Sequence, residues 1–147
     1  MGIGASRRRC TKTTATGEFE IANWDEDVFL GEAEGRRLTR ADVTQRFHGG
    51  IEGEGRVQWL MAYLEDGTAR FVGMQHVEGV IEGRRGSVVF ETDGEFDGAQ
   101  AKGNWRVVDG SGTDDWAGIR GEGGFAAPHG STATYSIVFR DAEGPIS

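Results

Sequence analysis

Cysteine and proline are nearly absent from this sequence, which contains one Cys and two Pro among 147 residues. The single cysteine, Cys10, excludes disulfides within the chain and is typical of proteins from a reducing compartment. No apolar run approaches the roughly 20 residues that a membrane-spanning helix needs, and no signal peptide is recognisable. We therefore expect a cytoplasmic protein without a membrane-spanning segment.

Known catalytic and cofactor-binding motifs are also missing. The sequence has no GxSxG elbow, no P-loop and no GxGxxG after a predicted strand. The three histidines lie far apart, and none has a neighbour at the spacing of metal ligands: His48, His76 and His129. The segment DGSGTDD (109–115) lacks the spacing and the closing Glu of a calcium loop and is read as a turn. We expect no metal and no cofactor, so any catalysis would rely on positioning, desolvation and a single acid or base.

Positive charge is scarce, with 16 Lys and Arg against 24 Asp and Glu and a formal net charge of -8. Such a surface repels phosphates and anionic lipid, so we expect neither nucleic acid nor a membrane as partner. The exception is the run Arg7-Arg8-Arg9-Cys10, which follows a formal match to a myristoylation signal. Because such matches are often false, a disordered tail over 1–16 is the favoured reading, with a second tail over 141–147.

The sequence is instead rich in glycine and in alternating apolar and charged residues. The 25 Gly suit tight turns, bulges and strand kinks, and no helical pattern of three turns occurs. From Gly17 onward, apolar and charged side chains alternate with a period of two. This pattern predicts about eight amphipathic strands over 17–140, separated by Gly-rich turns.

The strands need an arrangement that covers their apolar faces. An open sheet of eight would expose two edges and one whole apolar face, and closure into a barrel removes both problems. We therefore predict an all-β protein with a single closed antiparallel eight-stranded β-barrel. A sandwich of two sheets is the competing arrangement.

Uncharged polar side chains share the predicted inner face. By alternation, Gln75 lies on the same face as Phe71, whereas His76 faces solvent. Other polar residues fall on the inner sets of their own strands: Gln45, Tyr63 and Tyr135. Glu91 joins them only if Val89, rather than Val88 and Phe90, faces the core.

The lumen of an eight-stranded barrel is either just filled by side chains or able to hold one small ligand. In a filled lumen, buried amides and phenols hydrogen-bond each other or trapped water. In a hollow one, they orient a ligand against an apolar wall. The convergence of several uncharged polar groups favours the hollow lumen.

Several motifs together resemble the bacterial domain-of-unknown-function 3224 family over roughly 17–140. They are the GEFEIANWDED start, LMAY (60–63), DGTARFVG (66–73), GSVV (86–89) and GSGT (110–113). The resemblance implies a barrel of the allene-oxide-cyclase type. Proteins of that architecture include cofactor-free cyclases and dirigent proteins, whose lumen folds a hydrophobic substrate into a reactive shape. This chain departs from the pattern at Gln75, where relatives often carry Glu, and at Glu91-Thr92, where relatives tend to show Gln-His.

The first functional hypothesis is a cofactor-independent cyclase or isomerase. Its substrate would be a hydrophobic small molecule, polyketide- or lipid-derived, held in the lumen. Tyr63 and Gln75 would donate hydrogen bonds to a carbonyl that gains charge in the transition state, and Glu91 is the candidate general base. The candidate substrate-binding residues are Gln45, Trp59, Met61, Phe71, Trp105 and Tyr135.

Two alternatives remain open at this point. The same pocket without chemistry would make the chain a non-catalytic, lipocalin-like small-molecule binding protein. A lumen packed solid would leave a protein that acts through its surface, for example as a homodimer.

Overall fold

The structure is a computed structural model that describes residues 12–31, 35–128 and 132–141. The Arg7-Arg8-Arg9-Cys10 run and the segment 142–147 lie outside the described residues. The elements are β1 (Lys12–Gly31), β2 (Arg37–Gly49), β3 (Glu52–Tyr63), β4 (Ala69–Ile81), β5 (Arg84–Phe96), β6 (Gln100–Val107), the 3-10 helix η2 (Asp114–Trp116), β7 (Arg120–Pro128) and β8 (Ala133–Arg140).

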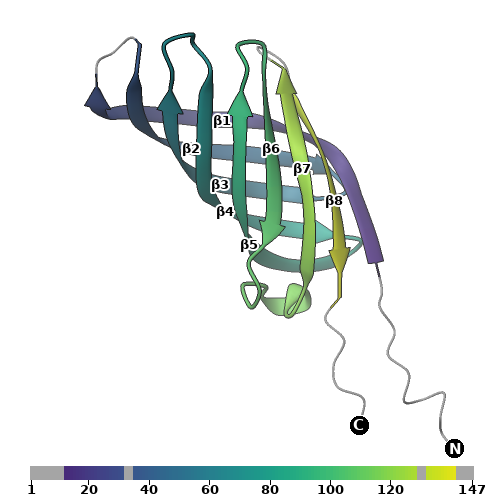
Figure 1. Cartoon of the computed structure of the whole chain (residues 1–147). Coiled ribbons are helices and arrows are strands. Elements are labelled where there is room, and N and C mark those ends of the chain that lie inside the picture. The colour runs from purple at the N-terminus through teal and green to yellow at the C-terminus, as the bar shows by residue number, and fades with distance from the viewer. Residues whose placement is uncertain (1–11, 32–34, 129–131, 142–147) are drawn as a thin grey trace, which may run out of the picture.

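The strands form one closed barrel, as Figure 1 shows. Each strand pairs antiparallel with the next along the chain, and β8 returns to pair with β1. The predicted fold class is therefore confirmed. The strand β1 begins at Lys12, so residues 12–16, expected in the tail, belong to the barrel. No helix in the described residues is long and apolar enough to cross a bilayer.

Side chains alternate between lumen and solvent as the period of two predicts. On β2, the inward residues from Ala41 to Phe47 are buried, and the same holds for Val57, Trp59 and Met61 on β3. His76 is exposed between the buried Gln75 and Val77. The alternation therefore places the core inside the barrel.

The 3-10 helix η2 lies at one end of the barrel, the lower end in Figure 1, and apolar side chains are buried at this end. Trp116 of η2 is buried there, and its indole Nε1 donates a hydrogen bond of 3.0 Å to the Arg84 carbonyl. The Tyr135 hydroxyl accepts from the Ile51 amide at 2.9 Å and donates to the His48 carbonyl at 2.8 Å. These bonds satisfy the polar groups that the plug buries.

Aromatic rings fill the adjacent part of the lumen. The ring centroids of Phe19 and Phe47 lie 5.2 Å apart, and those of Phe90 and Trp105 lie 5.0 Å apart. Glycine makes room for this packing, because a Cβ on Gly103 would lie 2.3 Å from the ring of Phe125. Some of the glycines are therefore needed to make room for side chains on the inner face rather than to form turns.

The strand β1 has an irregularity that shapes the other end. A register shift between Ile21 and Asn23 resets its alternation, so that Trp24 and Glu26 lie opposite Val43 and Ala41 of β2. A bulge of this kind adds one residue to one strand and bends it. The result is that Trp24 and Glu26 share the inner face of the barrel.

We expect Trp116→Ala to lower the free energy of unfolding by about 3–5 kcal/mol, because it empties a large buried site. Trp116→Phe, the matched control, should cost less, since it keeps one aromatic ring and loses the bond to the Arg84 carbonyl and part of the buried ring volume. Chemical denaturation of both variants measures the two losses. A loss below about 1 kcal/mol for the alanine variant would contradict the role of Trp116 as a plug.

Candidate functional site

An apolar cavity of about 350 Å³ opens at the end of the barrel opposite Trp116. We call it the mouth cavity. Its lining is almost entirely aromatic and aliphatic: Phe19, Ile21, Trp24, Trp59, Met61, Tyr63, Phe71, Phe96, Ala101, Phe125 and Ala127. The volume falls near the lower limit of small-molecule sites, which run from about 300 to 1,000 Å³.

The mouth cavity exists because β1 extends beyond the end of its pairing with β8. The pairing of β1 with β8 ends at Phe19 and Ala133, while β1 continues to Gly31 beside β2. Beyond Phe19, the inward-facing Ile21 and Trp24 are each 44% exposed. Among the described residues, no strand pairs with β1 beyond Phe19 on this side, and the lumen is open to solvent there.

Four of the residues predicted from the sequence come together in this cavity. Trp59, Met61 and Tyr63 reach it from the end of β3, and Phe71 reaches it from the start of β4. The ring centroids of Trp59 and Phe71 lie 5.1 Å apart. Trp59 and Phe71 thus form an aromatic part of the cavity wall, with Met61 and Tyr63 as further lining residues.

Gln45 and Gln75 face inward as predicted, but they lie in the filled part of the lumen and do not line the mouth cavity. Gln75 Nε2 donates to Gln45 Oε1 at 2.5 Å. Gly55 leaves space for this pair, because a Cβ there would lie 2.9 Å from Gln45 Oε1. Neither Gln45 Nε2 nor Gln75 Oε1 has a partner among the described residues.

Trp105 and Tyr135 also face inward, at other levels of the barrel. Trp105 is stacked on Phe90 in the filled part of the lumen. Tyr135 lies at the closed end, where its hydroxyl is bound to the backbone of Ile51 and His48. Neither residue lines the mouth cavity.

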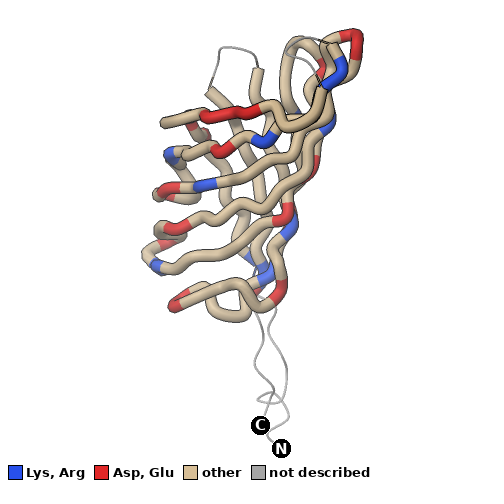
Figure 2. The backbone as a smooth tube through the Cα atoms, turned by 90° about the vertical axis from the view of Figure 1, so that its left-hand side faces the viewer, with Lys and Arg blue, Asp and Glu red and all other residues tan. Residues whose placement is uncertain are grey.

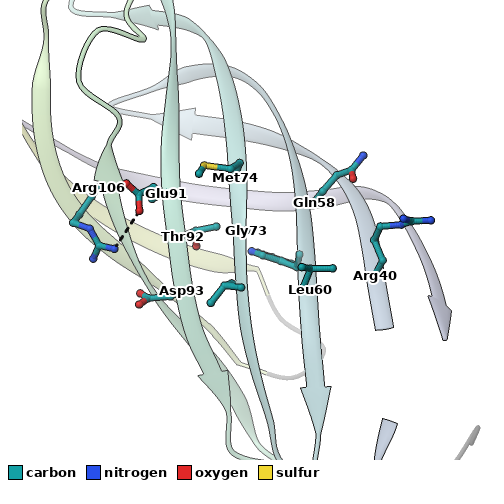
Figure 3. A pocket seen from close by; sticks show the side chains of 11 residues that line it. Arg40, Gln58, Leu60, Gly73, Met74, Glu91, Thr92, Asp93 and Arg106 are labelled. Atoms are coloured by element: carbon teal, nitrogen blue, oxygen red, sulfur yellow. Dashed lines mark ion pairs between the residues drawn. The ribbon is translucent and has the colours of Figure 1, made fainter. Parts of the chain in front are cut away.

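The expectation that Glu91 could face the lumen is wrong. Val88 and Phe90 are the buried residues of β5, so alternation turns Glu91 outward. Its carboxylate lies 3.7 Å from Arg106 Nη2 on the outer surface, as Figure 3 shows. Thr92 takes the inward position instead and is buried. Glu91 therefore cannot act as a base in the lumen.

A carboxylate that the sequence reading missed lies beside the mouth cavity. Glu26 Oε2 accepts from the Thr39 hydroxyl at 2.6 Å and from the Tyr63 hydroxyl at 2.8 Å. Glu26 Oε1 accepts from Trp24 Nε1 at 3.0 Å. Two of these three donors, Trp24 and Tyr63, also line the cavity.

The environment of Glu26 keeps it ionised. Burial acts to raise its pKa, but the hydrogen bonds from Thr39, Tyr63 and Trp24, with the charge of Arg37, together hold the pKa below its ordinary value. Burial and the bond to Glu26 raise the pKa of Tyr63 to about 12. The Arg37 guanidinium lies 3.8 Å from the centre of the Tyr63 ring, a cation–π contact.

The bulge in β1 is the reason that Glu26 was missed. Strict alternation from Phe19 and Ile21 leads on to Asn23 and Asp25, and would turn Glu26 to solvent. The signal available in the sequence was the change of phase itself, since Trp24 resumes the apolar pattern one residue late. In the part of the chain that the structure describes, no three His, Cys, Asp or Glu side chains gather as metal ligands would.

These features define a class of protein: a single antiparallel eight-stranded barrel, plugged at one end and open to an apolar cavity at the other. The chain belongs to the family described as Protein of unknown function (DUF3224), whose model matches residues 15–139. No curated protein matches it.

A solved structure is similar over most of its length. It is a crystal structure of a protein with unknown function from the DUF3224 family of Shewanella oneidensis MR-1. The two chains are 25% identical, with a TM-score of 0.71, and the match covers 89% of this chain and 97% of the other. The solved structure thus comes from the same family as this chain, and its fold is similar to the barrel described above.

The lowered pKa of Glu26 predicts a pH dependence of stability. Because its pKa is lower in the folded chain than in the unfolded one, its contribution is present above the ordinary value of 4.5 and is lost as the pH falls through the folded value. Glu26→Gln should therefore lose less stability than the wild type between neutral and acidic pH. Urea denaturation at a series of pH values measures this, with Glu91→Gln on the outer surface as control. Equal losses in Glu26→Gln and the wild type would contradict the assignment.

Proposed function

We propose that this protein binds a small apolar molecule in the mouth cavity. The observation that carries the proposal is the cavity of about 350 Å³ with an almost wholly apolar lining. The opposite end is plugged by Trp116, so a ligand enters and leaves through one opening. Rings already held in place by packing lose little freedom when they bind a ligand, which favours affinity.

The ligand we propose has an apolar body and a hydroxyl or amine at one end. An ionised carboxylate offers about four acceptor positions, and the described donors to Glu26 occupy three of them. A hydrogen-bond donor that reaches the edge of the cavity would therefore be accepted there. A carboxylate on the ligand would instead be repelled by Glu26.

A cofactor-independent isomerase or cyclase acting on a polyketide- or lipid-derived molecule is the second candidate. The Tyr63–Glu26 pair beside the cavity favours it, because a hydroxyl and a carboxylate are the usual groups for moving a proton. However, the pKa of Glu26 is lowered and that of Tyr63 is raised to about 12, and efficient acid–base catalysts titrate near neutral pH. Binding without chemistry is therefore our first choice.

Binding can be tested with decanol, decylamine and decanoate, followed by tryptophan fluorescence, since Trp24 and Trp59 line the cavity. We expect decanol and decylamine to bind about tenfold or more tightly than decanoate, a difference of about 1.4 kcal/mol. Glu26→Gln should remove this preference. Retention of the preference in Glu26→Gln would show that another group selects the ligand.

A matched pair of variants tests the location. Ala127→Leu fills part of the cavity and should weaken binding, whereas Ala126→Leu, one residue earlier on β7, points the other way and should not. If both variants weaken ligand binding equally, the mouth cavity is not the binding site. Incubation of the protein with a small-molecule extract, followed by liquid chromatography with mass spectrometry, separates the two candidates, because a compound of equal mass with a new retention time is formed only if the chain is an enzyme.

A further inference from the structure

The outer face of the barrel carries a strip of apolar side chains, although the outer face of an amphipathic strand is normally polar. Leu60 of β3 and Val72 and Met74 of β4 point to solvent with exposed fractions of 52%, 54% and 57%. Leu60 lies directly opposite Val72, and Figure 3 shows Leu60 and Met74 on neighbouring strands. They border a shallow groove of about 640 Å³ on the outside of the barrel. We call these three residues the outer strip.

The apolar surface continues toward the mouth of the barrel. Leu30, Leu38, Ala62 and Leu64 line a second outer groove, also of about 640 Å³, which is bordered by charged residues: Arg36, Arg37, Glu65 and Asp66. Leu30 is paired with Leu38 across β1 and β2, and Leu38 with Ala62 across β2 and β3. Contiguous exposed apolar surface of this kind on a soluble protein marks an interaction site.

Unpaired charges of opposite sign flank the outer strip. Across the sheet, the order of directly paired residues is Arg40, Leu60, Val72 and Asp93. Neither Arg40 nor Asp93 forms an ion pair with any residue that the structure describes, although Asp93 accepts a hydrogen bond from Asn104. The row thus has a cation and an anion on either side of two apolar residues, and Arg40 in turn lies opposite Asp27 of β1.

The next row of the same face has its charges already neutralised. Asp42 is bound by Arg56, with Nη2 and Oδ2 2.7 Å apart, and Glu91 is paired with Arg106. Figure 2 shows the acidic run of β1 in red, whereas residues 57–63 of β3 and 71–77 of β4 include no Lys, Arg, Asp or Glu. The row from Arg40 to Asp93 therefore offers a partner two charges that no ion pair among the described residues uses.

We propose that this face is the interface of a homodimer. A two-fold axis parallel to the strands, between Leu60 and Val72, reverses the order of the row. It places Arg40 against Asp93 of the partner subunit and Leu60 against Val72 of the partner subunit, and each contact occurs twice. A second copy is favoured over other partners because the row, when its order is reversed, places a cation opposite an anion at both ends. Anionic lipid is disfavoured by Asp93 and by the net charge of -8.

Sedimentation of the full chain over a range of concentrations tests the dimer. We expect a species of twice the chain mass, and Arg40→Asp or Asp93→Arg alone should weaken it about tenfold or more, because each creates two like-charge contacts. The double variant, with the charges exchanged, should recover the wild-type affinity. Arg120→Asp on β7, with the same charge change outside this face, is the control and should leave the dimer unchanged.

Leu60→Lys provides a second test, since it places a charge in the centre of the outer strip at a position that solvent already reaches. It should give a monomer whose circular dichroism matches that of the wild type. A wild-type chain that stays monomeric at every concentration would overturn the proposal. A dimer that is insensitive to Leu60→Lys, or is not restored by the double exchange, would also overturn it.

Discussion

The antiparallel pairing of β1 with β8 is the interaction on which the rest of the structure depends. It closes the barrel only as far as Phe19 and Ala133, whereas β1 continues to Gly31. Within the closed part, the ring of strands is complete and aromatic side chains fill it. Beyond it, one wall ends early, and the lumen opens into the mouth cavity. The packed floor and the open mouth both follow from this difference in strand length.

The bulge in β1 gives the opening its chemical character. One added residue turns Trp24 and Glu26 inward, so that an ionised carboxylate lies beside an otherwise apolar cavity. Removing a carboxylate from water is costly, and here three hydrogen-bond donors offset that cost. A partly buried charge with its bonds satisfied is stable, and in the function we propose it selects ligands by the charge of their polar end.

Much of the fold and part of the site could be predicted from alternation, because the direction of a side chain on a strand is a local property. Trp59, Met61, Tyr63 and Phe71 were found in this way. Glu91 was misplaced because the run from Val88 to Phe90 is apolar on both faces. Gln75 and Tyr135 were assigned to the correct face, but their level in the barrel depends on register between strands, which alternation does not contain.

The sequence by itself determined an all-β chain with one buried and one solvated face per strand, because period-two alternation of apolar residues has no other stable use. It also favoured closure over an open sheet, since an open sheet would leave edges and an apolar face in water, but a sandwich of two sheets met the same need until the structure showed the barrel. Only the tertiary structure decided where the lumen is hollow and that Glu26 is hydrogen-bonded to two residues of its lining. Those features depend on how far β1 extends beyond its pairing with β8. They also depend on the bulge in β1, which shifts the alternation of inward and outward side chains by one residue.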